Sequence, residues 1–194
     1  MIRCMLSKIN PEKYDIKRAG VIPFVDVDGN MLKNKIEGNI RLWGFSIDRR
    51  YRELSDFGGK VEKKDNNSIE AALREFKEES LDSFPIPDNI SECEVVIDPV
   101  RHMMIIFIPI DINPIDADNI FNSRVNKNSE SYGIVWLSGQ KIKNGIIFSG
   151  KIGSEIETSN SKQHKIQRKF YKNIKDILRY YFVGGDFIRN QDSI

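Results

Sequence analysis

The order of apolar and polar residues along the chain predicts a series of β-strands. Alternating or continuous apolar runs that are bounded by turn residues, such as Asp28 and Gly29 after the first run, are typical of strands. Residues 102–110 are apolar almost throughout, which predicts a strand buried on both faces. Residues 1–18, in contrast, are polar and irregular. The predicted strands are residues 19–27, 40–47, 93–97, 102–110 and 134–137.

Two segments have the 3.6-residue period of an α-helix instead. In residues 68–80 a stripe of side chains recurs on one face, and Asn67 with Glu70 three residues later forms a capping pair at the start. Residues 163–182 repeat the pattern, and Gly184 with the glycine after it stops the helix. The stripe of the first helix consists of Ile69, Leu73, Phe76 and Ser80.

Strands and helices interleave along the chain, which predicts one α/β domain. We find no internal repeat and no linker, and 194 residues fit a single domain with a real core. We expect one domain over residues 1–194, with its core at about 18–182 and flanking segments at 1–17 and 186–194. Residues 111–132 read as a polar loop, which is longer than most loops without a function.

The composition excludes several classes of protein. The chain has 30 basic and 28 acidic side chains, so its net charge of +2 gives no overall attraction to nucleic acid or anionic lipid. Cys4 and Cys93 lie far apart without a Cys/His cluster, which predicts neither a disulfide framework nor a zinc site. The apolar run at 103–110 is too short to span a membrane, and the N-terminus lacks the apolar segment of a signal peptide. We therefore expect a soluble, intracellular, cytoplasmic protein without a membrane partner.

Glu75, Glu78 and Glu79 are the strongest candidates for chemistry in the chain. At positions i, i+3 and i+4 of a helix they share one face, where like charges repel unless something positive compensates them. Mg²⁺ and Mn²⁺ prefer hard oxygen ligands, so a divalent cation bound together with phosphate fits this triplet. The alternative is an ordinary solvated helix with Glu and Lys pairs.

The rest of the helix is expected to hold this acidic face in place. The apolar stripe on the opposite side packs on the sheet. Arg74 lies one turn before Glu78 and is placed to pair with it. Ala71 and Ala72 precede the acids on their face, where small side chains leave room for a ligand.

Residues 58–81 resemble the Nudix box of the Nudix hydrolases, written G-x5-E-x7-R-E-U-x-E-E-x-G-U with U an aliphatic residue. The preceding G-G-K-V-E sequence and the flanking predicted strands extend the similarity over about residues 18–180. The matching positions are Gly59, Arg74, Glu75, Phe76, Glu78, Glu79 and Leu81, the last taken as the closing apolar position.

The sequence departs from this pattern at two places. Asp65 stands where the family has Glu, and eight residues instead of seven separate it from Arg74. Ser80 is taken to replace the closing glycine, so we expect the helix to lose an easy left-handed cap. The three glutamates are unaffected by either change.

The resemblance implies a single α/β/α sandwich with a mixed β-sheet. It implies a hydrolase of phosphorus-containing anhydrides, which cleaves a pyrophosphate bond in a nucleoside diphosphate linked to another moiety. The implied cofactor is Mg²⁺ or Mn²⁺. The implied metal ligands are Glu75, Glu78, Glu79 and the backbone carbonyl of Gly59.

The resemblance also suggests which residues are catalytic or bind the substrate. Either Glu78 or Glu79 serves as the general base, or Glu130 in the polar loop does so, and Arg74 is counted with this catalytic group. Residues upstream of the helix are candidates for contacts with the outer phosphates, although a solvated strand end is the alternative for at least one arginine. These candidates are Arg49, Arg50, Arg52 and Lys60.

A basic segment near the C-terminus leaves the substrate open. Residues 162–179 contain seven Lys or Arg side chains and one acid, Asp176. They form either the solvent face of a core-packing helix or an RNA contact, which would suit an mRNA-decapping Nudix enzyme that releases m7GDP.

Other substrates and one other class of function also fit the sequence. Dinucleoside polyphosphates, nucleotide sugars, oxidised nucleotides and diphosphoinositol polyphosphates all carry the bond that the resemblance implies. A catalytically inactive Nudix-fold binding module is the alternative of a different class. The sequence indicates no oligomeric state.

Overall fold

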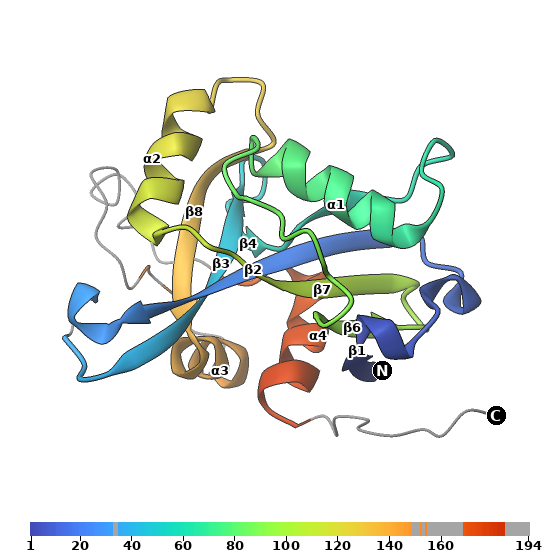
Figure 1. The fold of residues 1–194 in the computed structure, drawn as a ribbon, viewed down its shortest axis with the longest axis horizontal. Coiled ribbons are helices and arrows are strands. Elements are labelled where there is room, and N and C mark those ends of the chain that lie inside the picture. The colour runs from blue at the N-terminus through green and yellow to red at the C-terminus, as the bar shows by residue number, and fades with distance from the viewer. Residues whose placement is uncertain (33–34, 149–151, 153, 155–168, 185–194) are drawn as a thin grey trace.

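A mixed β-sheet runs through the centre of the protein (Figure 1). The structure is a computed structural model, and it describes residues 1–32, 35–148, 152, 154 and 169–184. Its strands are β1 (Ile2–Met5), β2 (Arg18–Asp28), β3 (Asn39–Asp48), β4 (Leu54–Ser55), β5 (Phe57–Lys60), β6 (Glu94–Asp98), β7 (Met103–Pro109) and β8 (Ser131–Ser138). The order is β1-β6-β7-β2-β3-β4, while β5 also pairs with β2, and β8 with β3. Only β2 and β7 pair in parallel among these described strands, which makes the sheet mixed.

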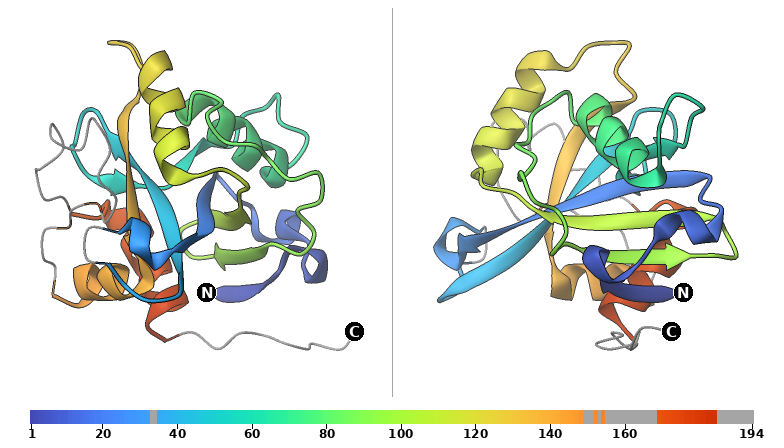
Figure 2. Two further views of the ribbon diagram at one scale, coloured as in Figure 1. Left: turned by 60° about the vertical axis from the view of Figure 1, so that its left-hand side comes forward. Right: turned by 45° about the vertical axis from the view of Figure 1, so that its right-hand side comes forward.

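Helices cover both faces of this sheet. The described helices are α1 (Ser68–Glu79), α2 (Pro114–Arg124), α3 (Gly139–Ile147) and α4 (Lys172–Phe182), with short 3₁₀ turns at Leu6–Lys8, Pro11–Tyr14 and Gly29–Met31. Helices α1 and α2 lie on one side of the sheet, and α3 and α4 on the other, as the two views of Figure 2 show. Phe76 and Phe121 belong to the core under α1 and α2, whereas Ile142 and Ile177 belong to the core under α3 and α4. The α/β sandwich with a mixed sheet is thus confirmed.

Strand β7 supplies side chains to both cores. Met104 and Ile106 face α1 and α2, while Ile105 and Phe107 face the other side, and all four are fully buried. Successive side chains of a strand point to opposite faces, so a strand covered on both sides has to be apolar throughout. This confirms the doubly buried strand predicted at residues 102–110.

The five predicted strands correspond to β2, β3, β6, β7 and β8, but three strands were not expected. The prediction that residues 1–18 are irregular is wrong for β1, which pairs antiparallel with β6 from Ile2 opposite Ile97 to Met5 opposite Glu94. Strands β4 and β5 have two and four residues, too few for a period to show in the sequence. The two strands nevertheless matter, because β5 carries the glycines that precede α1.

The prediction of a polar loop at residues 111–132 is wrong, because α2 lies within it. Its start has ordinary capping, since the Asn113 side chain accepts a hydrogen bond from the Ile115 N–H and Pro114 occupies the first turn. The buried face includes Asp118 between Ala117 and Phe121. An acid on the buried face interrupts the apolar stripe and hides the helix from a periodicity argument.

The predicted helix at residues 163–182 is confirmed only in its second part. Helix α4 begins after Tyr171, and Phe170 instead forms a parallel β-bridge with Leu54. Residues 163–168 lie outside the described residues. None of the helices in the described ranges is long and apolar enough to cross a membrane.

Both cysteines are free thiols inside the molecule. Burial raises the pKa of the Cys4 thiol, and burial together with the charge of Glu92 raises the pKa of Cys93 to about 11. Protonated thiols are poor nucleophiles, so these residues have the properties of packing groups.

Candidate active site

Helix α1 lies across β2 and β5 and presents its small residues to them. The Asn67 side chain accepts a hydrogen bond from the Glu70 N–H at 2.8 Å, which confirms the predicted cap. Ala71 and Ala72 are fully buried against the sheet, so the prediction that they leave room for a ligand on the acidic face is wrong. Their small size instead allows the helix to approach the strands closely, with Phe76 packed edge-on against Phe57.

The C-terminal end of α1 has a left-handed turn, but not at the residue expected. The Asp82 N–H donates to the Lys77 carbonyl at 2.8 Å and the Leu81 N–H to the Glu78 carbonyl at 3.2 Å, which is the Schellman pattern. Leu81 has a φ of +54°, whereas Ser80 keeps a helical backbone. The assignment of Ser80 to the glycine position is therefore wrong. In E-E-x-G, Ser80 is the x residue and Leu81 stands at the glycine.

Three of the glutamates of α1, Glu75, Glu78 and Glu79, line one pocket with residues from two other segments. The pocket has a volume of about 540 Å³. Glu130, which lies more than fifty positions after Glu75 in the sequence, closes it from the side of the α2–β8 connection. The lining consists of Gly59, Lys60 and Glu62, then Glu75, Glu78, Glu79 and Leu81, and finally Asn126, Asn128, Ser129 and Glu130. Four of the sequence-predicted acids are thus brought together.

Glu79 is the innermost of these acids. Its carboxylate accepts a hydrogen bond from the Gly58 N–H at 3.1 Å. Burial, followed by the charge of Asp56, raises the pKa of Glu79 well above its usual value, and Glu130 adds to the rise. The positive charge of Arg18 and the Gly58 hydrogen bond act in the opposite direction. Burial therefore has the largest effect on this carboxylate, and Asp56 and Glu130 add negative charge around it.

A buried ion pair lies beneath Glu79, and no pattern in the sequence indicated it. Arg18 of β2 donates to both oxygens of Asp56, at 2.7 and 2.8 Å, and to the Gly58 carbonyl at 2.9 Å. The Asp56 side chain is completely buried. It fits only because Gly20 and Gly58 lack side chains, since a Cβ on either would lie within 2.6 Å of an Asp56 oxygen. The pair thereby fixes the strand that precedes the acidic helix.

Glu75 lies directly against Gly59. A Cβ added at Gly59 would approach the Glu75 carboxylate to 2.4 Å. Burial raises the pKa of Glu75, the hydrogen bond and charge of Arg74 lower it, and the charges of Glu78 and Glu130 raise it again. The glycine at this position is therefore what allows a carboxylate to reach the floor of the pocket.

Arg74 pairs with Glu78, as the sequence predicted, and has three further partners in Glu75, Asp65 and the Lys60 carbonyl. It donates to Glu75 at 2.8 Å and to Glu78 at 3.0 Å. Its other nitrogens bind both oxygens of Asp65, at 2.8 and 3.0 Å, and the Lys60 carbonyl. The Arg74 hydrogen bond lowers the pKa of Asp65 to about 2. Asp65, the residue that departs from the family pattern, thus anchors the arginine.

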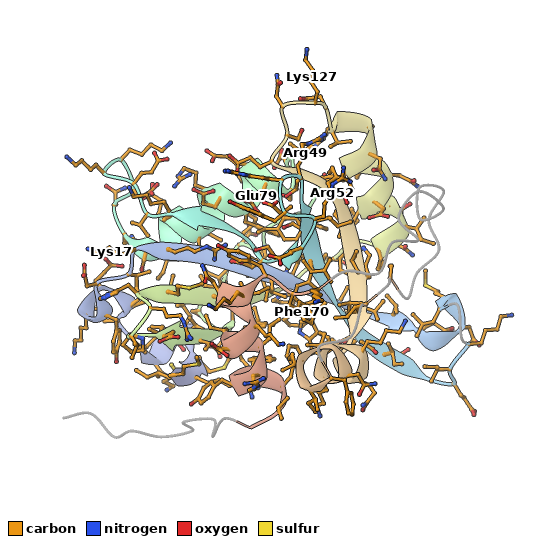
Figure 3. The ribbon with its side chains drawn as sticks, turned by 180° about the vertical axis from the view of Figure 1, so that it is seen from behind. Lys17, Arg49, Arg52, Glu79, Lys127 and Phe170 are labelled. Atoms are coloured by element: carbon orange, nitrogen blue, oxygen red, sulfur yellow. The ribbon has the colours of Figure 1, made fainter. Side chains whose placement is uncertain are left out.

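The candidate substrate residues lie around this pocket in different ways. Lys60 is exposed and lines it. Arg50 lies over the ring of Tyr51 and Arg52 over the ring of Tyr132, at 5.1 and 4.8 Å. Arg49 donates hydrogen bonds to backbone carbonyls of the α2–β8 connection. In the view of Figure 3 Arg49, Arg52 and Glu79 lie in the same region, below the outward-pointing Lys127.

The donor set of the pocket fits Mg²⁺ or Mn²⁺. Carboxylates and a backbone carbonyl are the hard oxygen ligands that these ions prefer. Burial raises the pKa values of Glu75 and Glu79 and neighbouring acids add to the rise, so a bound cation would favour the ionised carboxylates. Within the described residues, however, no three His, Cys, Asp or Glu side chains are already gathered as a metal site. Oxygens of Glu75 and Glu79 are instead bonded to Arg74 and to the Gly58 N–H.

No protein-family model matches the sequence, and no curated protein matches it. The chain is similar to a binary complex of a C. elegans Ap4A hydrolase, at 14% identity over 86% of this chain and 94% of that chain, with a TM-score of 0.43. A second structure of C. elegans Ap4A hydrolase is 15% identical over 64% and 81% of the two chains, with a TM-score of 0.38. A mutT/nudix family protein from Listeria innocua is 14% identical over 87% and 92%, with a TM-score of 0.43.

Proposed function

We propose that the protein is a Nudix-type pyrophosphohydrolase, which hydrolyses a pyrophosphate bond in a nucleoside diphosphate linked to another moiety. The observation that supports this is the convergence of Glu75, Glu78, Glu79 and Glu130 on one pocket beside Gly59. A solvated helix with ordinary ion pairs, the alternative left by the sequence, does not explain why Glu79 is half-buried or why a distant acid faces the triplet. A site for a cation and a phosphate chain explains both.

In this proposal the carboxylates and the glycine hold the cation. Glu75, Glu78, Glu79 and the Gly59 carbonyl are its ligands. A bound Mg²⁺ or Mn²⁺ offsets the charge of the diphosphate and lowers the pKa of a bound water. Arg74 orients Glu75 and Glu78 through its hydrogen bonds to them, and Asp65 keeps the arginine in that position.

The attacking water loses its proton to a glutamate. Glu78 and Glu79 on α1 are candidates, and Glu130 faces them from the other side of the pocket. The side chain of Glu130 is exposed, which leaves it accessible to a water molecule that enters with the substrate. We favour Glu130, because Glu79 is bonded to the Gly58 N–H and Glu78 to Arg74.

Cations at the rim of the pocket bind the outer phosphates. Lys60 lines the pocket, and Arg50 and Arg52 lie on the turn between β3 and β4. Guanidinium groups bind phosphate oxygens strongly because they offer parallel donors. The turn that carries Arg50 and Arg52 would therefore meet the part of the substrate beyond the scissile bond.

The test is hydrolysis of a panel of diphosphates with and without a divalent cation. The panel contains capped RNA, a cap dinucleotide, diadenosine polyphosphates, ADP-ribose, nucleotide sugars, oxidised nucleotides and diphosphoinositol polyphosphates. We expect cleavage of at least one class with Mg²⁺ or Mn²⁺ and loss of cleavage in EDTA, with phosphate-containing products identified by mass spectrometry. Metal-independent cleavage, or binding of a member without any cleavage, would contradict the proposal. The second result would favour a Nudix-fold binding module.

The same panel decides whether RNA is the substrate.

The apolar side chains of α4, Ile174, Ile177 and Leu178, are fully buried, which explains the helix by core packing. Its basic residues Lys172 and Arg179 are exposed. Lys169 is also exposed and Lys175 is partly buried, whereas Lys162, Lys165 and Arg168 lie outside the described residues. mRNA decapping therefore remains one substrate class among several in this proposal.

Gly59→Ala is expected to lower the activity without unfolding the protein. The new methyl group would overlap the Glu75 carboxylate, which lies at the end of a flexible side chain and can move away. Displacing a ligand by about 1 Å costs roughly 10²-fold in rate, and kcat/KM measures the loss. Gly58→Ala is the matched contrast. Its methyl group would meet the Gly20 backbone at 2.5 Å, so a lower unfolding temperature is expected there. Full activity of Gly59→Ala would contradict the placement of Glu75.

A further inference from the structure

Arg49 ties the α2–β8 connection to the end of β3. Its Nε donates to the Ser129 carbonyl and its Nη2 to the Asn126 carbonyl, each at 2.7 Å. Its backbone N–H donates to the Glu130 carbonyl at 2.8 Å. One residue thus makes three hydrogen bonds to a five-residue segment, and all three acceptors are backbone carbonyls.

The segment that Arg49 binds is a turn that holds its own shape. The Asn126 N–H donates to Ser129 Oγ at 3.1 Å, and the Ser129 N–H donates to the Asn126 carbonyl at 3.2 Å. The Asn128 N–H also donates to Asn126 Oδ1 at 2.8 Å. A turn with internal hydrogen bonds moves as a unit, so its position depends on what ties it to the rest of the fold.

The sheet itself gives this turn little support. Pairing between β3 and β8 is regular up to Ser46 opposite Ile134, then shifts through a bulge to Asp48 opposite Ser131. Glu130 directly precedes Ser131 in the sequence, so it lies just beyond the last paired residues. Irregular pairing at the end of a ladder determines a side-chain direction less well than regular pairing does. Beyond that point the Arg49 backbone N–H still bonds the Glu130 carbonyl, and its guanidinium adds the bonds to the Ser129 and Asn126 carbonyls.

The chemistry of arginine suits this clamp. A guanidinium offers donors in a rigid planar fork, so it can hold two carbonyls in a fixed relative geometry, whereas a lysine ammonium offers a single point of attachment. Arg49 is half-buried, and it is not among the described residues that line the pocket. Its bonds point to the turn behind Glu130. The sequence-based expectation had placed this side chain on the substrate instead.

We propose that Arg49 is a positioning residue, which clamps the 126–129 turn so that Glu130 faces Glu75, Glu78 and Glu79 across the pocket. This inference rests on the proposed function for its catalytic consequence, because Glu130 is the favoured base there. Arg49 itself touches neither the substrate nor the cation. Arg49 affects the rate only because it positions Glu130.

A double-mutant cycle in the full-length protein tests the proposal. Arg49→Met should lower kcat by about 10- to 100-fold and leave KM within about twofold, because a displaced base slows the chemical step without weakening binding. Glu130→Gln should lower kcat at least as much. In the Glu130→Gln background Arg49→Met should add no more than about twofold, because the base that it positions is already lost. Arg49→Lys should recover part of the rate.

Arg101→Met is the control for a general structural effect. Arg101 also ties separate elements, since it bonds Asp98 and Asp176, but it does not line the pocket in the described part of the chain. Its loss should change the unfolding temperature and leave kcat unchanged. Additive losses in the Arg49 and Glu130 double variant, or a rise in KM with unchanged kcat, would overturn the positioning role. The second result would indicate instead that Arg49 contacts the substrate.

Hydrogen exchange separates a failed inference from a failed function. Arg49→Met should raise amide exchange selectively in residues 125–131, whether or not any substrate is cleaved. Unchanged exchange there would overturn the clamp even in an active enzyme. A wild-type protein that cleaves nothing in the panel would instead overturn the proposed function, while faster exchange in the variant would still support the clamp.

Discussion

Glu79→Gln is expected to abolish most of the hydrolytic activity while the protein stays folded. The glutamine amide has nearly the same shape, and its oxygen can still accept the hydrogen bond from the Gly58 N–H. It brings no negative charge to the cation and cannot accept a proton. We expect kcat/KM with the substrate found in the panel to fall by about 10²- to 10⁴-fold. Wild-type activity in this variant would contradict both the metal site and the enzyme assignment.

The stability of the Glu79→Gln variant tests the metal site independently of its activity. Burial, and then the charges of Asp56 and Glu130, disfavour ionised Glu79, so the metal-free variant should unfold at the same urea concentration as the wild type, or a higher one. Mg²⁺ or Mn²⁺ should stabilise the wild type, because a ligand that binds only the folded state raises the free energy of unfolding. The variant should lose most of that gain. Glu70→Gln, on the same helix but outside this pocket, is the matched control and should keep the metal-dependent gain in stability of the wild type.

The acidic helix could be predicted because its signals are local. Asn67 and Glu70 mark its start, and the spacing of Glu75, Glu78 and Glu79 places them on one face by helical geometry alone. The role of Arg74 followed for the same reason, since its distance from Glu78 is one turn. Features that depend on a few neighbouring residues are the ones that a single sequence reveals.

The face of α1 that packs on the sheet could not be assigned from the period alone. Ile69 and Leu73 had been expected to form the buried stripe, but both are only partly buried, whereas Ala71 and Ala72 are completely covered. A helix that lies close to a sheet needs small residues at the contact. Hydrophobicity ranks Ile and Leu first, and the close packing that favours Ala is visible only in the fold.

The partners of the acidic face were hidden for a different reason. Glu130 was proposed from the family resemblance, and nothing in its own neighbourhood indicated that it meets the triplet. Arg18 and Asp56 are separated by 38 positions, and each reads as an ordinary strand-end charge. Adjacent strands β2 and β5 bring them together, with Gly20 opposite Gly58 in the register. The glycines indicate that the two strands approach each other closely, but they do not indicate which side chain lies between them.

The Arg18–Asp56 pair can be compared with a second ion pair of the same geometry. Arg41 donates to both oxygens of Asp26, at 2.8 Å each, as Arg18 does to Asp56. The two pairs differ in burial: the Asp56 side chain is 0% exposed and the Asp26 side chain 52%. Exposed pairs contribute little because water screens both charges, whereas removing one partner of a buried pair leaves a charge that nothing offsets.

Asp56→Asn is therefore expected to destabilise the protein strongly, and Asp26→Asn hardly at all. The asparagine keeps the shape that fits between Gly20 and Gly58, so the substitution removes the charge without opening a cavity. Arg18 remains buried opposite a neutral group. We expect the free energy of unfolding in urea to fall by about 3–5 kcal/mol for Asp56→Asn and by about 0–1 kcal/mol for Asp26→Asn. Equal losses would show that burial does not make the Arg18–Asp56 pair special.

Replacing Arg18 and Asp56 together by apolar residues should then cost less than Asp56→Asn alone, because no unpaired charge is left inside.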